Sequence, residues 1–158
     1  MRYKEKIRFI QSYNNLIEKE LKKIKENVLK STSKDSGENI AEKYFKKQSY
    51  DVFRSKVKSG YRIIGVEYYW KEYKDSLNSQ DLKIIKTIKS ITSPTEFRKL
   101  AYLFKDKNGC PDLMLIKDHK IKFVEVKTNN EEVKISTIEF FIKMNKKYPL
   151  EILRIKKS

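Results

Sequence analysis

Hydrophobic residues recur at helical spacing over the first 30 residues. The series consists of Tyr3, Ile7, Ile10, Ile17, Leu21, Ile24 and Val28, and polar Asn14 falls in the same series. This spacing predicts an amphipathic helix over residues 1–30. Written as heptads, the stripe either packs on the protein's own domain, which we favour, or forms the seam of a homodimer in which Asn14 sets the register.

The remaining chain switches between helical and strand patterns. In chain order we expect a polar linker at 31–37, a helix at 38–48, strands at 50–54 and 61–66, and helices between 67 and 107 that start at Ser79 and Ser93. After these come a β-hairpin, a helix that starts at Ser136 with Glu139 as its capping-box partner, and a last strand near residues 150–155. The sum is an α/β protein.

The β-hairpin is the most informative segment. Its two apolar runs are 111–117 and 120–127, and the residues between them, Asp118 and His119, both tolerate positive φ. If the turn is centred on these two residues, the residue numbers of every directly opposed pair add up to the same total. The pattern therefore predicts the register of the hairpin as well as its existence.

This register brings two carboxylates together. Asp112 lies opposite Glu125, where directly opposed Cβ atoms are about 4.5–5.5 Å apart. Lys127 projects from the same face as Glu125, because side chains alternate along a strand. Two like charges beside apolar strands are costly unless a cation or another partner neutralises them. The alternative is a surface salt bridge between Lys127 and either acid.

Composition narrows the class of protein. The 158 residues include 37 Lys and Arg against 21 Asp and Glu, a net charge of +16, while 39% are hydrophobic. This composition excludes an intrinsically disordered chain and favours a polyanionic partner such as DNA. One cysteine and one histidine exclude an internal disulfide and Cys/His metal clusters. Without a long apolar stretch or an apolar leader, we expect a cytoplasmic protein with no membrane partner.

Three segments, GCPDLMLI, KFVEVK and ISTIEFF, resemble the PD-(D/E)xK nuclease superfamily, and most closely its VRR-NUC branch and the archaeal Holliday-junction resolvases. The similarity covers residues 37–54 and 109–155. It implies a restriction-endonuclease-like core, a mixed sheet with a central β-hairpin flanked by helices. The expected domain organisation is an N-terminal helix at 1–30 and a nuclease-like domain at 37–158, with a helical insertion at about 55–108.

The resemblance also assigns roles at the site. It implies that Asp112, Glu125 and the main-chain carbonyl of Val126 bind the metal, and that Lys127 orients or polarises the attacking water. Such families carry a further glutamate on the preceding helix, which here matches Glu38. The oxygen ligands favour Mg²⁺ or Mn²⁺.

Two further acids are candidates for this site. Glu42 is one helical turn after Glu38 and could replace it. Glu139 stands where many relatives have glutamine; it could add a metal contact, but helix capping is the interpretation we favour. Cys110 is interpreted as a packing residue rather than a nucleophile.

Basic and aromatic residues supply candidate DNA contacts. The predicted phosphate contacts lie around the loop after the first strand of the nuclease-like domain: Arg54, Lys56, Lys58 and Arg62. Aromatic residues then alternate with lysines: Tyr68, Tyr69, Trp70, Lys71, Tyr73 and Lys74. They could stack on unpaired bases or form the core of the inserted region, and we favour the core.

These observations support three hypotheses. The first is a divalent-metal-dependent endodeoxyribonuclease that acts on DNA, with branched or flapped substrates as in the families it resembles. The second is a non-catalytic, basic nucleic-acid-binding protein on the same fold. The third is a protein-interaction module built around the N-terminal helix.

Overall fold

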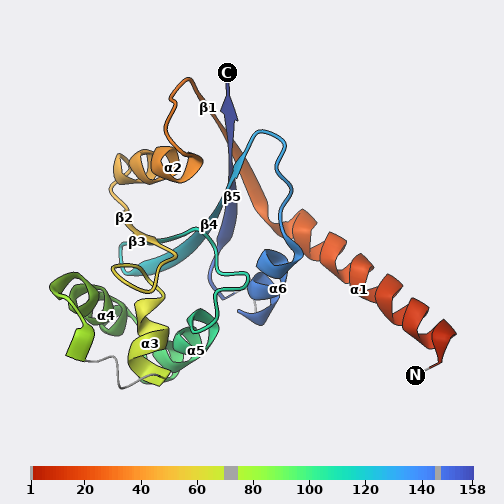
Figure 1. Ribbon diagram of the computed structural model, residues 1–158, viewed down its shortest axis with the longest axis horizontal. Coiled ribbons are helices and arrows are strands. Elements are labelled where there is room, and N and C mark those ends of the chain that lie inside the picture. Colours follow the sequence, from red (N-terminus) through yellow and green to blue (C-terminus); the bar gives the residue numbers. More distant parts are fainter. Residues whose placement is uncertain (1, 70–74, 145–146) are drawn as a thin grey trace.

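The fold is built on one mixed β-sheet with helices on both faces (Figure 1). The computed structural model describes residues 2–69, 75–144 and 147–158. Within these ranges the strands are β1 (Lys25–Ser31), β2 (Asp51–Arg54), β3 (Leu113–Lys117), β4 (Lys120–Thr128) and β5 (Leu150–Lys157). Their order across the sheet is β1-β5-β4-β3-β2. β5 is parallel to both of its neighbours, whereas β3 is antiparallel to both of its own.

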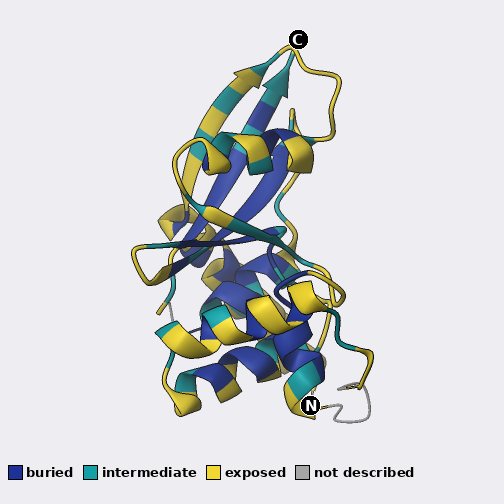
Figure 2. Cartoon of the chain, turned by 90° about the vertical axis from the view of Figure 1, so that its left-hand side faces the viewer, coloured by how far each residue is buried: buried dark blue, intermediate teal, exposed yellow. Residues whose placement is uncertain are grey.

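Helices cover the two faces unequally. They are α1 (Tyr3–Lys23), α2 (Gly37–Lys46), α3 (Ile63–Tyr69), α4 (Ser79–Ile91), α5 (Pro94–Phe104) and α6 (Ile135–Lys143). α2 packs on one face, against Leu113, Val124 and other side chains of β3, β4 and β5. α3 to α6 and the end of α1 pack on the other face, against Met114 and Phe123. Figure 2 shows the central strands buried between these layers.

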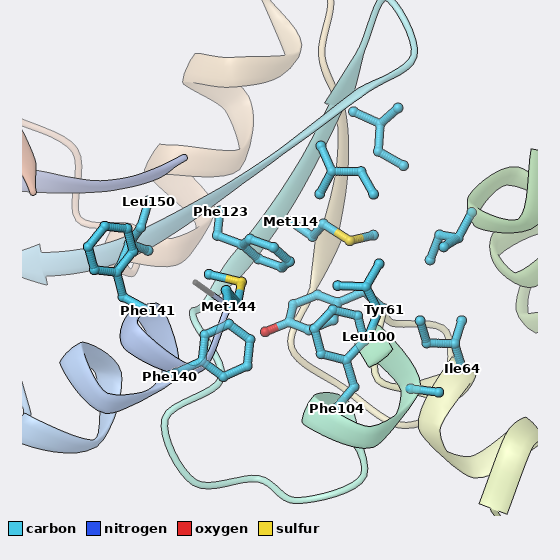
Figure 3. Close-up of a cluster of buried hydrophobic side chains, with 14 of the residues drawn as sticks. Tyr61, Ile64, Leu100, Phe104, Met114, Phe123, Phe140, Phe141, Met144 and Leu150 are labelled. Atoms are coloured by element: carbon cyan, nitrogen blue, oxygen red, sulfur yellow. The ribbon is translucent and has the colours of Figure 1, made fainter. Parts of the chain in front are cut away.

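An aromatic core lies beneath the larger helical layer (Figure 3). The ring of Tyr61 is fully buried and packs edge-on against Phe104 and Phe123, with centroid distances of 4.7 and 5.8 Å. Phe104 also stacks on Phe140 of α6. Phe104 comes from the helical block at 55–108, and Phe123 comes from β4. The block therefore shares its core with the sheet.

The β-hairpin has the predicted register. Leu113 pairs with Val124 and Lys117 pairs with Lys120. The two turn residues, Asp118 and His119, have φ values of 53° and 62°. Both values suit the type I′ turn that joins tightly paired, twisted strands.

The N-terminal helix is shorter than predicted. α1 ends at Lys23. Residues 25–30, expected to continue the helix, and Ser31, expected to begin the linker, instead form β1. Asn27, Val28 and Ser31 are poor helix formers. In β1 the backbone pairs in parallel with β5, and the amide of Asn27 donates to the buried Glu151 carboxylate at 2.7 Å. Pairing with a distant strand therefore overrides the heptad pattern.

Only the C-terminal half of α1 packs on the body. Ile17 and Ile24 are each 7% exposed, and α1 contacts α6. The N-terminal half projects from the body (Figure 1), and Tyr3 is 78% exposed. Packing on the protein's own domain is thus observed for half of the stripe, and the homodimer seam stays a prediction.

The expected strand at 61–66 was wrong. Residues Ile63–Tyr69 form α3, whose first four residues are all buried. A short apolar run fits a strand and a buried helix equally well by periodicity. Gly65 decides between them, because α3 lies so close to the end of α5 that a Cβ there would sit 2.7 Å from the Lys105 nitrogen.

Of the three helix starts predicted at a serine, only the one at Ser136 needs correction. Ser93 caps α5 as predicted, accepting a hydrogen bond from the Glu96 amide. α4 begins at Ser79, but its cap is Asn78. α6 begins at Ile135, before Ser136, and no side chain caps it. Among the described residues, no helix is both long enough and apolar enough to cross a membrane.

Candidate active site

A cleft of about 740 Å³ lies at the end of the hairpin opposite its turn. Its walls come from the start of α2, the end of β2, the loop before β3, the end of β4 and the start of α6. The five predicted catalytic and metal-binding residues all line it: Glu38, Asp112, Glu125, Val126 and Lys127. The fold therefore brings together the carboxylates and the lysine of the predicted site.

The side chains of Asp112 and Glu125 interact across the hairpin, as the register requires. One Asp112 oxygen accepts a hydrogen bond from the Val126 amide at 2.8 Å, which ties the loop before β3 to β4. Burial, followed by the adjacent Asp112 carboxylate, raises the pKa of Glu125 well above its ordinary value. A cation between the two oxygens would relieve this repulsion.

Glu125 is held by a residue that sequence analysis missed. The hydroxyl of Thr137, in the first turn of α6, donates to a Glu125 oxygen at 2.6 Å, and both residues are buried. Lys127 is only 6% exposed and lowers the pKa of Glu125, against the stronger effect of burial. Thr137 lies within the ISTIEFF segment, but its role depends on how α6 packs against β4.

Gly109 and Tyr61 position the loop that carries Asp112. Gly109 has a φ of +80°, and a Cβ there would lie 2.2 Å from the carbonyl oxygen of Ser136. The loop can approach the start of α6 only because residue 109 lacks a side chain. From the buried aromatic core, the Tyr61 hydroxyl donates to the Pro111 carbonyl at 2.5 Å.

Glu38 reaches the cleft from the opposite face of the sheet. Arg54, at the end of β2, donates to Glu38 at 3.3 Å and to Glu42 at 2.6 Å. Glu42 also pairs with Lys46, and these two cations outweigh partial burial and lower its pKa. Glu42 is not among the described residues that line the cleft. Glu38 is therefore the acid of α2 that is available to the site.

Two other predicted site residues, Glu139 and Arg62, lie outside the cleft. Glu139 is on the side of α6 that faces α1, where it forms a hydrogen bond with Tyr13. Burial and, to a smaller extent, Glu139 raise the pKa of Tyr13. Arg62 is 9% exposed and donates to the carbonyls of Phe104 and Lys105, so its predicted role as a DNA contact was wrong. Lys56 lines the cleft.

Cys110 has a structural environment. Its thiol donates to the Asp106 carbonyl at 3.2 Å, and burial raises its pKa to about 11. A thiol with a raised pKa is a poor nucleophile at neutral pH. The interpretation of Cys110 as a packing residue agrees with this geometry.

The chemistry of the cleft fits a hard divalent cation. Two carboxylates meet there beside main-chain oxygens, in a space large enough for bound water. Among the residues in the described ranges, no group of three His, Cys, Asp or Glu side chains is arranged to hold a metal. The residues that could bind one are Asp112, Glu125 and the Val126 carbonyl, with Glu38 on the opposite wall.

Comparison with known proteins gives a likeness in fold. No protein-family profile matches the sequence, and no curated protein matches it significantly. Among solved structures, the chain is similar to paFAN1 bound to DNA with a two-nucleotide 5′ flap and a gap, with a TM-score of 0.50 and 8% identity. The match covers 85% of this chain and 38% of the paFAN1 chain. The mixed sheet flanked by helices is thus a restriction-endonuclease-like α/β fold, as predicted.

Proposed function

We propose that this protein is a divalent-metal-dependent DNA endonuclease, with flapped or branched DNA as its substrate class. The observation that carries the proposal is the convergence of Asp112, Glu125 and Lys127 in one cleft. The resemblance of the hairpin to PD-(D/E)xK nucleases supports it. So does the fold shared with a protein that has been crystallised on 5′-flap DNA.

In this proposal, each residue has a distinct task. Asp112, Glu125 and the Val126 carbonyl would hold Mg²⁺ or Mn²⁺. When bound, the cation polarises a phosphoryl oxygen and lowers the pKa of a bound water. Thr137 fixes the orientation of Glu125 through its 2.6 Å hydrogen bond. The ammonium group of Lys127 stabilises the negative charge that develops as the phosphodiester bond is attacked.

The charge around the site suits a phosphate backbone. Lys56, Lys107 and Lys134 line the cleft with Lys127, around the central acids. The chain as a whole carries a net charge of +16. Each neutralised duplex phosphate contributes about −0.9 to the slope of log affinity against log salt concentration. We therefore expect DNA affinity to fall steeply with salt.

The test is a cleavage panel. Flapped, fully duplex and single-stranded DNA are each incubated with the full chain in Mg²⁺, Mn²⁺ or EDTA. We expect cutting only with a divalent cation, and a loss of at least about 100-fold in rate for Asp112→Asn, Glu125→Gln and Lys127→Ala. Glu132→Gln and Lys120→Ala remove matched charges at exposed positions and should cut like the parent protein.

The outcomes separate the hypotheses. Binding without cleavage in every metal would refute the nuclease and support the non-catalytic DNA-binding protein. Absence of binding even at low salt would refute both and leave the interaction module. Equal losses in the site variants and the exposed controls would show that overall charge, rather than the cleft, determines activity.

A further inference from the structure

Two tyrosines and a lysine form an exposed cluster outside the cleft. The rings of Tyr69 in α3 and Tyr102 in α5 meet edge-on, with their centroids 6.2 Å apart. The ammonium nitrogen of Lys105 lies 4.7 Å from the Tyr102 ring centroid and 5.6 Å from that of Tyr69. Tyr102 is 58% exposed and Tyr69 is 38% exposed.

Packing does not account for this cluster. The buried side of α5 consists of Phe97, Leu100, Ala101 and Phe104, and Tyr102 lies outside that set. As far as the described residues go, Tyr69 and Tyr102 also belong to neither hydrophobic core. The sequence favours a core role for the aromatic segment that begins at Tyr68. Its first two residues, Tyr68 and Tyr69, are instead exposed, and residues 70–74 lie outside the described ranges.

The cluster is close to the cleft. Lys105 immediately follows α5, and two residues later Lys107 is part of the cleft wall. Two residues of extended chain span at most about 7 Å. Positive charge therefore continues from the cleft, through Lys107, to the aromatic cluster at Lys105.

We propose that Tyr69, Tyr102 and Lys105 form a binding site for unpaired nucleobases. The inference rests on the proposed function, because the strand that supplies these bases is taken to be held in the nuclease cleft. The ammonium of Lys105 lies over the Tyr102 ring, and more than half of the Tyr102 surface stays exposed to a base. Lys105 adds a positive charge beside the strand's phosphates.

The geometry selects single-stranded over duplex DNA. Inside a duplex, the faces of the bases are already stacked on one another and cannot reach a protein ring. Stacking on aromatic side chains is tolerant of sequence, because every base has a π-face. The site should therefore favour DNA with a single-stranded extension, whatever the sequence of that extension.

The test measures binding in EDTA, so that no cleavage takes place. Fluorescence anisotropy gives the affinity of the full chain for an oligothymidine strand, an abasic strand of the same length, and a duplex. We expect Tyr102→Ala to weaken binding of the thymidine strand about 5-fold or more and to leave the abasic strand and the duplex unchanged. Tyr102→Phe, which keeps the ring, and Tyr3→Ala, at an exposed tyrosine on α1, should bind like the parent protein.

Other results would overturn the site. Unchanged binding by Tyr102→Ala, or an equal loss on the thymidine and abasic strands, would show that the ring does not stack on bases. Thermal melting of each variant, followed by circular dichroism, separates a local effect from unfolding. Because the assay needs no metal, base-dependent binding can be found in a protein that cleaves nothing. Conversely, if the protein cuts flapped DNA but binds the thymidine and abasic strands equally, the base-binding site is refuted and the proposed nuclease function is not.

Discussion

Replacing Gly109 with alanine tests whether the loop before β3 must lie against α6. At the Gly109 φ of +80°, a left-handed conformation costs any residue with a Cβ about 1–2 kcal/mol. The new Cβ would also lie 2.2 Å from the carbonyl oxygen of Ser136, whereas ordinary contact begins at 3.4 Å. Such overpacking costs about 1–3 kcal/mol more. We therefore expect Gly109→Ala to lower the free energy of unfolding by about 2–5 kcal/mol.

The same substitution should impair catalysis in the molecules that remain folded. To relieve the contact, the loop or the start of α6 must move by about 1 Å. The loop carries Asp112 and α6 carries Thr137, which holds Glu125. A misplacement of about 1 Å can lower an enzymatic rate about 100-fold. We expect a loss of this order in the flap-cleavage rate at a temperature where the variant is folded.

Urea unfolding, followed by circular dichroism, measures the stability effect. Asn108→Ala is the matched control, because Asn108 is an exposed neighbour in the same loop. Surface substitutions of this kind change stability by no more than about 0.5 kcal/mol. If Gly109→Ala unfolds at the same urea concentration as the parent protein, the close approach to Ser136 does not constrain the loop and the reasoning fails.

Three further predictions concern other parts of the molecule. Arg62→Met should lower the free energy of unfolding by about 1.5–3 kcal/mol in urea, since two carbonyls lose a charged donor. Arg62→Met should leave the slope of log DNA affinity against log salt concentration unchanged. Lys56→Ala should reduce the magnitude of that slope by about 0.9. The Tyr148 hydroxyl donates to Glu96 and lowers the pKa of this carboxyl. The free energy of unfolding that Glu96→Gln removes should therefore become smaller as the pH falls below about 4. Urea unfolding at several pH values tests this. In thermal melting, Mg²⁺ should raise the melting temperature of the parent protein and not that of Asp112→Asn.

Local chemistry explains which parts of the fold the sequence predicts. The hairpin register follows from alternation and from two turn residues that accept positive φ, all within 17 consecutive positions, 111–127. β1 could not be recognised in this way, because its partner β5 lies at the other end of the chain. The apolar run at 61–66 has no periodicity that separates a strand from a buried helix. Only its packing on α5 decides the question.

The same distinction between local and long-range contacts applies to the residues of the site. Asp112, Glu125 and Lys127 belong to one hairpin, so their proximity follows from its register. Thr137 joins them through the packing of α6, and Tyr61 supports them through the packing beneath β3. No spacing in the sequence encodes these contacts. For Arg62 the sequence suggests a contact that the structure does not have. A basic residue beside a glycine-containing loop suggests a position on the surface, but the Arg62 guanidinium donates to main-chain carbonyls.

The energetics of the cleft connect its structure to its chemistry. Glu125 is buried and Asp112 is half-buried, which makes this carboxylate pair unfavourable. The fold offsets part of that cost with the Val126 amide on Asp112 and the Thr137 hydroxyl on Glu125. These donors are neutral, so they satisfy hydrogen bonds but do not cancel the two effects that keep the pKa of Glu125 raised, which are burial and then the adjacent Asp112 carboxylate. Among the lysines that line the cleft, Lys127 is the buried one, so in the interior one positive charge faces the two acids. The apolar strands and the aromatic core on either side hold the acids in place despite this imbalance, and a divalent cation is the species whose charge and oxygen preference would correct it.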